Sequence, residues 1–229
     1  MHIVCFKHVP FEGPAAIADW AQSRGHSIEC IEVYAEDPLP DANRYEMLIV
    51  MGGPMNIYQE GLYPWLAVEK QAIRKAIDGG KIVVGVCLGG QLIADVLGGS
   101  VTRGDTVEIG WLPIERSRDC PSELPLPDSL HVYHWHGDTF ALPDNAVRIA
   151  STKGCANQGF LYNKRVLGLQ CHLETTRESM NALIEACEEE SSEGPFIQSA
   201  EMMRAEPDET FEKMQAVLFE ILDQISSHG

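Results

Sequence analysis

The first hundred residues alternate short apolar runs with segments whose apolar side chains recur every three or four positions. The runs predict strands buried on both faces of a parallel sheet, and the segments predict helices. The predicted strands are His2 to Phe6, Ser27 to Tyr34, Met47 to Met51 and Ile82 to Val86, and the predicted helices are Pro14 to Arg24, Pro64 to Asp78 and a segment from Gln91 to Leu97. This order, with short connections, predicts a doubly wound, mostly parallel α/β sheet with flanking helices.

From residue 101 onward the apolar runs are shorter and are separated by turn residues. They predict strands at Val101 to Arg103, Glu108 to Ile114, Leu130 to His136, Val147 to Ser151, Gln158 to Asn163 and Val166 to Cys171. Helical periodicity returns from Thr176 to Glu190 and from Asp208 to Ile225. We find neither an internal repeat nor an interdomain linker. We therefore expect residues 1–229 to form a single domain, with residues 191–229 as a C-terminal helical extension.

One junction between a predicted strand and a predicted helix carries a cysteine. Cys87 stands at the centre of Gly85 to Gly89, so a glycine lies two residues to either side of it. A turn of this kind pushes its side chain out above the sheet, as in a nucleophile elbow with sulfur in place of hydroxyl. The N-terminus of the following helix favours the thiolate form. A buried core cysteine is the alternative, but the flanking glycines favour a nucleophile.

Two further candidates follow predicted strands. His172 and Glu174 come after the apolar run from Val166, and in an extended segment their spacing puts both side chains on one face. Glu174 can then orient the imidazole toward a neighbouring thiol, which is the triad logic of acyl transfer. The turn at Gly53 ends another strand on the same edge of the sheet. Backbone N–H groups of Gly53 and Leu88 are therefore predicted to form an oxyanion hole.

The composition mainly excludes certain binding partners and locations. The chain has 34 acidic and 17 basic side chains, for a formal net charge of -17. We expect such a protein to bind neither nucleic acid nor an anionic membrane, because phosphates attract lysine and arginine. Its seven cysteines are scattered without a Cys-x-x-Cys pair, and the N-terminus reads as a strand rather than a signal peptide. Apolar runs stay well short of the roughly 20 residues of a membrane span. These features predict a cytoplasmic protein with free thiols.

Three segments together carry a family resemblance. They read Gly-Val-Cys-Leu-Gly-Gly-Gln at 85–91, Gly-Gly-Pro at 52–54 and Gly-Leu-Gln-Cys-His-Leu-Glu at 168–174. In order and spacing they resemble the signatures of the class I (triad) glutamine amidotransferase domain, and the resemblance spans residues 1–176. It implies a flavodoxin-like architecture of the stand-alone type, similar to the glutaminase domain of GMP synthase. One departure is Leu173, where the family most often has proline.

The resemblance also implies an activity. Cys87, His172 and Glu174 would hydrolyse the side-chain amide of glutamine through a γ-glutamyl thioester and release ammonia, without a cofactor. The substrate-binding residues that it implies are Gln91, Trp135, Gly137 and Asp138. In the well-known synthetases such a domain is fused or paired to an acceptor that consumes the ammonia, so a separate synthetase is an expected partner.

Other interpretations of the sequence stay open. The segment His134 to Asp138 reads His-Trp-His-Gly-Asp and would place three potential metal ligands on one face of a strand. A later histidine cluster that would complete a metal set is lacking in the sequence, so we assign no metal. The same triad in a more open pocket would make a γ-glutamyl hydrolase or peptidase that acts alone. A non-catalytic regulatory protein on this fold is the third hypothesis, and the intact triad disfavours it.

Overall fold

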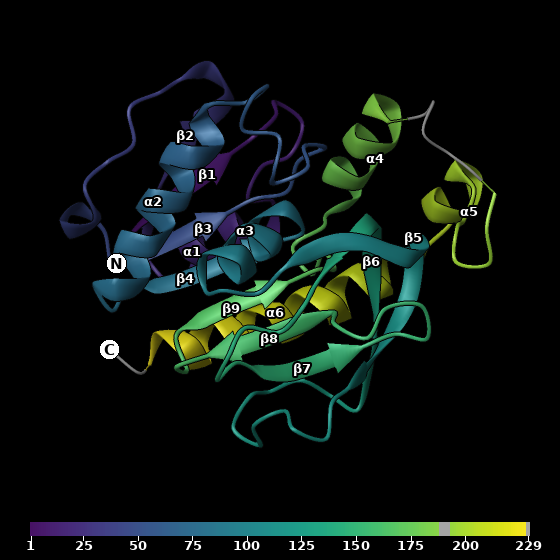
Figure 1. Ribbon diagram of the computed structural model, residues 1–229. Coiled ribbons are helices and arrows are strands. Elements are labelled where there is room, and N and C mark those ends of the chain that lie inside the picture. The colour runs from purple at the N-terminus through teal and green to yellow at the C-terminus, as the bar shows by residue number, and fades with distance from the viewer. Residues whose placement is uncertain (188–192, 228–229) are drawn as a thin grey trace.

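The computed structural model describes residues 1–187 and 193–227, and its nine described strands form one sheet (Figure 1). The strands are β1 (His2–Lys7), β2 (Ser27–Glu32), β3 (Met47–Val50), β4 (Ile82–Val86), β5 (Val101–Arg116), β6 (Ser129–Phe140), β7 (Val147–Ser151), β8 (Gly159–Tyr162) and β9 (Val166–Leu169). The helices are α1 (Ala16–Ser23), α2 (Trp65–Asp78), α3 (Leu88–Val96), α4 (Arg177–Ala186), α5 (Ala200–Arg204) and α6 (Asp208–Ser226), with short 3-10 turns η1 (Val33–Ala35) and η2 (Ala42–Arg44).

The order of strands across the sheet is β2-β1-β3-β4-β9-β8-β7-β5-β6. The first five pair in parallel, and the apolar runs of β3, β4 and β9 are buried along their whole length. Helices cover both faces of a parallel sheet, so such strands need apolar side chains on both sides. The α/β fold class expected from the sequence is confirmed.

The other half of the sheet is antiparallel, and it contains one long hairpin. The separate strands predicted at Val101 to Arg103 and Glu108 to Ile114 are wrong in their division, because β5 is continuous from Val101 to Arg116. Its pairing with β6 shifts register between Arg103 and Glu108 and then resumes. The irregularity resembles a β-bulge, which bends a strand without ending it.

Two layers of helices pack on the sheet (Figure 1). The core on one face includes buried side chains of α1, α4, α5 and α6, and the core on the other face includes those of α2 and α3. Residues 188–190 of the predicted helix Thr176 to Glu190 lie outside the described residues, as do residues 191–192 and 228–229 of the expected extension. The short helix α5 was not predicted, because only Met203 of its five residues is buried. Among the described helices, none combines the length and apolarity needed to cross a membrane.

The start of α3 differs from the prediction, and the difference shapes the site. The helix begins at Leu88 rather than Gln91, directly after β4. A Cβ atom added to Gly89 would overlap the carbonyl of Val50, and one added to Gly90 would overlap that of Leu169. Glycine is therefore required for close packing inside the first turn of the helix, where sequence alone suggested a turn.

Candidate active site

Cys87 occupies the turn between β4 and α3. Its backbone has φ 52° and ψ -109°, a conformation that side-chain-bearing residues rarely adopt. A Cβ on Gly85 would overlap the backbone of Gly89, so the turn can be this tight only with glycine at that point. The Cys87 side chain is 8% exposed, and its Sγ lies 3.7 Å from the carbonyl oxygen of Trp135 and 3.8 Å from Nε2 of Gln170. The sharp turn thus presents the thiol to a cavity between β4 and β6.

His172 and Glu174 lie beyond the end of β9 and point toward one another. His172 Nδ1 is 2.8 Å from Glu174 Oε1, and both side chains are buried. The backbone N–H of His172 donates to the carbonyl of Tyr133, and the carbonyl of Glu174 accepts from Ala16, at 2.8 and 3.0 Å. Leu173 turns the other way into the core and is 1% exposed. Leucine in place of proline therefore leaves the imidazole and the carboxylate on one face.

The surroundings of His172 favour its protonated form. Burial opposes the charge, but the Glu174 carboxylate and an interaction with Cys87 together raise the pKa of His172 well above its usual range. Nε2 of the imidazole is buried, and none of the described residues forms a hydrogen bond of normal length with it. That nitrogen is therefore available to exchange a proton with the thiol or with a bound molecule.

The predicted oxyanion-hole amides lie close together. A Cβ on Gly53 would come within 3.1 Å of Leu88 Cδ2, so the β3 turn lies against the first residue of α3. Among the described residues, we find no hydrogen-bond acceptor for the backbone N–H of Gly53 or of Leu88. Two such free donors beside Cys87 have the arrangement that stabilises a tetrahedral oxyanion in acyl transfer.

A buried ion pair between His8 and Glu69 holds the turn at Gly52 and Gly53. His8 Nδ1 lies 2.9 Å from the carbonyl oxygen of Gly52, and His8 Nε2 lies 2.8 Å from Glu69 Oε1. Both side chains of the pair are fully buried. Burial lowers the pKa of His8, but Glu69 and Gly52 raise it further, so the net shift is upward. The pair fixes the glycine turn, and sequence reasoning missed it.

One cavity of about 450 Å³ joins most of these groups. The predicted site residues that line it are Gly53, Cys87, Gln91, Trp135, Gly137, Asp138 and His172. Leu88 and Glu174 do not line the cavity. Leu88 could act there through its backbone amide, and Glu174 through the imidazole of His172. The turns after β3 and β4, the first part of α3, a stretch inside β6 and the segment after β9 thus meet at one cavity.

The predicted substrate-binding residues have different hydrogen-bond and ion-pair partners. Gln91 is buried and donates from Nε2 to Gln170 Oε1 at 3.2 Å. Asp138 accepts a hydrogen bond from Asn56 at 2.8 Å and lies 3.6 Å from the guanidinium of the largely exposed Arg103. A Cβ on Gly137 would overlap that guanidinium. A cation and an anion therefore lie side by side at this end of the cavity.

Several lining residues were not predicted. They are Glu12, Arg103, Val107, Ile109, Leu183 and Cys187, among others, while His136 was considered only as a metal ligand. Glu12 had a usable signal, because it follows β1 at the same edge of the sheet as Gly53 and Cys87. The residues of β5 and α4 had none, since only the folded chain brings them to the cavity.

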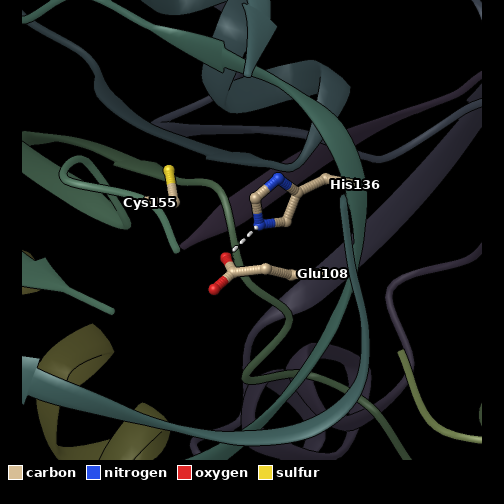
Figure 2. A group of neighbouring side chains, drawn as sticks. All are labelled: Glu108, His136 and Cys155. Atoms are coloured by element: carbon tan, nitrogen blue, oxygen red, sulfur yellow. Dashed lines mark ion pairs between the residues drawn. The ribbon is translucent and has the colours of Figure 1, made fainter. Parts of the chain in front are cut away.

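A second cluster adjoins the cavity and contains possible metal ligands. Glu108, His136 and Cys155 each offer one ligand atom within 4.8 Å of the others (Figure 2). These atoms already have protein partners. Glu108 accepts from His136 at 3.0 Å and from Thr152 and Gln158, while Cys155 Sγ lies 3.2 Å from a threonine hydroxyl. Burial opposes ionisation of Glu108, yet these hydrogen bonds lower its pKa. The network accounts for the cluster as a support for His136 in the cavity wall.

The metal-binding arrangement considered for His134 to Asp138 is not assembled. His134 is fully buried, and burial together with His136 lowers its pKa to about 3, so the ring is neutral. Asp138 is bound to Asn56 and Arg103 instead. The three side chains therefore do not converge on one point.

Comparisons with known proteins find a family model and several relatives that match the chain. Residues 15–187 match the family model for glutamine amidotransferase class-I. The glutamine amidotransferase-like protein YfeJ of Salmonella typhimurium is 34% identical over 229 residues, covering 96% of this chain and 95% of YfeJ. GMP synthase of Mycobacterium marinum is 34% identical over 152 residues, but these cover 65% of this chain and only 26% of that enzyme.

Solved structures show the same architecture. The crystal structure of SMU.1228c has a TM-score of 0.91 at 34% identity and covers 99% of this chain and 100% of that one. A glutamine amidotransferase from Methylobacillus flagellatus has a TM-score of 0.90 at 28% identity, covering 99% and 94%. The likeness therefore extends beyond residues 52–54, 85–91 and 168–174 to α5 and α6.

Proposed function

The chain belongs to the class I glutamine amidotransferase family, and from this premise we propose that it hydrolyses the side-chain amide of glutamine through a Cys87-His172-Glu174 triad. The observation that carries the proposal is one cavity lined by both Cys87, in its strained turn, and His172, which Glu174 holds through a 2.8 Å contact. A thiolate paired with an imidazolium is the form in which a cysteine attacks an amide.

In the first half of the reaction, Cys87 Sγ forms a bond to the γ-carbonyl carbon. The N–H groups of Gly53 and Leu88 stabilise the oxyanion of the tetrahedral intermediate. The C–N bond then breaks, and His172 transfers its Nε2 proton to the departing nitrogen, which leaves as ammonia. Glu174 keeps the imidazole in position and stabilises its charge throughout.

In the second half, water attacks the γ-glutamyl thioester. Neutral His172 takes a proton from the water as the new C–O bond forms, and the C–S bond breaks to give glutamate and the free thiolate. Gln91, Trp135, Gly137 and Asp138 would hold the α-amino and carboxylate groups of the substrate meanwhile. The charged pair of Asp138 and Arg103 supports that assignment.

A γ-glutamyl hydrolase or peptidase using the same triad is the second candidate. The cavity volume of about 450 Å³ favours it, because ligand sites of roughly 300–1,000 Å³ accept molecules larger than an amino acid. Such a site has room for a substituent on the amide nitrogen.

The proposal also covers the domain organisation, the compartment and the partners of the protein. We infer a single domain that works in the cytoplasm, and the seven free cysteines support a reducing compartment. In the glutaminase role the ammonia would pass to a separate synthetase, as the likeness to part of GMP synthase suggests. We expect neither nucleic acid nor membrane among its partners, because the net charge is -17.

The test compares turnover of glutamine and of γ-glutamyl dipeptides by the purified chain. A glutamine-mimicking alkylator, 6-diazo-5-oxo-norleucine, should label Cys87, identified by mass spectrometry, and Cys87→Ala should remain unlabelled. Labelling at another cysteine would contradict the proposal. Failure to turn over any of these substrates, with the thiol unlabelled, would favour a regulatory protein.

A further inference from the structure

Glu12 is a carboxylate in the cavity that the proposed mechanism does not use. It lies between β1 and α1, lines the cavity, and is partly buried. In the described parts of the chain it forms neither a hydrogen bond nor a close ion pair, although the charges of His172 and His8 act on it. The other acids near the triad differ in this respect, since Glu174 is bound to His172 and Asp138 to Asn56 and Arg103.

The position of Glu12 is next to the proton donor. A Cβ on Gly52 would overlap Glu12 Oε2 and lie 3.5 Å from His172 Cε1, so both groups lie against the same glycine. Glu12, His172 and Leu183 also line a second, much smaller cavity together. Burial raises the pKa of Glu12 and the charge of His172 opposes this, so that the net shift is upward and a bound cation would favour the carboxylate form. The carboxylate is thus partly desolvated and close to the imidazole.

The proton transfer from His172 determines how a substrate lies in the cavity. His172 must deliver its proton to the leaving nitrogen, so that nitrogen lies beside His172 and its substituent extends past the imidazole. The lining of the same cavity includes the apolar side chains of Val107, Ile109 and Leu183. The lining also contains the charged pair Arg103 and Asp138, which suit the α-carboxylate and α-amino groups of a glutamyl unit. A leaving group beside His172 is therefore also beside the carboxylate of Glu12.

Given the proposed cysteine hydrolase function, on which this inference rests, we propose that the preferred substrates are γ-glutamyl amides of alkylamines that carry a second, cationic amino group, which Glu12 binds. The same carboxylate repels leaving groups that end in a carboxylate, such as those of γ-glutamyl dipeptides. Cys87 displaces the amine, which takes the His172 proton as the C–N bond breaks, and water then releases glutamate from the thioester.

Three matched substrates test the inference. They are the γ-glutamyl amides of 1,4-diaminobutane, of n-pentylamine and of 5-aminopentanoate, which have similar lengths and end in a cation, a methyl group and an anion. We expect kcat/KM to fall in that order for the wild-type protein. The cation should exceed the methyl compound by about 10- to 100-fold, the usual effect of one charge-assisted contact in a sheltered site. Glu12→Gln should bring this ratio close to one.

Glu178→Gln is the matched control, because it removes one exposed carboxylate from α4 outside the cavity lining. It should leave the ratio unchanged. Using a ratio removes any general effect of Glu12 on His172, since both substrates need the same proton transfer. A wild-type protein without preference for the cation, or an unchanged ratio in Glu12→Gln, would overturn the inference alone if glutamine or the pentylamide is still hydrolysed through Cys87. Failure to hydrolyse glutamine and all three amides would overturn the proposed function and the inference together.

Discussion

The strained backbone of Cys87 makes a prediction about stability that is independent of any substrate. Replacing Cys87 by alanine removes the thiol but keeps a Cβ atom at φ 52°. Replacing it by glycine removes the Cβ as well, and glycine adopts positive φ without steric cost. Cys5 is a matched control, because it is a fully buried free cysteine in the regular strand β1. At Cys5 the alanine and glycine variants should also differ in stability, but glycine relieves no backbone strain there, because the residue lies in a regular strand.

The expected magnitude follows from two opposing effects. At an ordinary position glycine is less stable than alanine by about 0.5–1 kcal/mol, with a further loss of buried methyl contact. At Cys87 the same losses apply, but glycine also relieves about 1–3 kcal/mol of backbone strain. The change from alanine to glycine should therefore be about 1–3 kcal/mol more favourable at Cys87 than at Cys5. In melting temperature this is about 2–4 °C for each kcal/mol in a chain of this size.

The measurement is urea-induced unfolding of the four variants, with the slope of each transition compared to confirm a common mechanism. Cys87→Ala and Cys87→Gly should both lose hydrolysis entirely, and Cys87→Ala should unfold close to the wild-type midpoint. An equal alanine-to-glycine penalty at the two positions would show that the elbow is unstrained, and the structural reasoning about this turn would then be wrong.

Three further variants probe the supports of the site. Glu174→Gln should move the alkaline limb of the kcat/KM profile to lower pH. The carboxylate raises the pKa of the triad histidine, so its loss lets the ring deprotonate earlier; an unmoved limb would contradict the pairing. Glu69→Ala should cost about 3–5 kcal/mol in unfolding free energy, because it leaves buried His8 without its partner, and Glu69→Gln, which keeps an acceptor, should cost less. Gly168→Ala should cost about 1–3 kcal/mol through overlap with the Phe160 ring, yet leave kcat nearly unchanged; a large fall in kcat with stability intact would refute that separation.

The sequence predicts the parts of the site that stand next to strong local signals. Cys87, His172 and Gly53 each follow an apolar run that can only be a buried strand, and parallel strands bring their carboxyl ends to one edge. Glu12 obeys the same rule, but a single acid without a partner motif does not stand out. The position after a strand therefore identifies a site residue only together with a motif.

The remainder depends on contacts between distant segments. The division of β5 at residues 104–107 could not be avoided from sequence, because only pairing with β6 shows that the strand continues. Gly89 and Gly90 suggested a turn because glycine disfavours helices, and the approach of Val50 and Leu169 overrides that preference. Arg103 reaches Asp138 only because the hairpin folds back on itself.

The place of β9 in the sheet has a consequence for biosynthesis. Of the described strands this one is made last, yet it lies in the middle of the sheet, between β4 and β8. While the ribosome is still producing residues 87–165, β4 exposes a fully apolar strand with an open edge, which is a template for pairing with another nascent chain. Transcripts truncated before Val166 should therefore yield insoluble fragments, and chaperones that shield strand edges should matter most during that interval of translation.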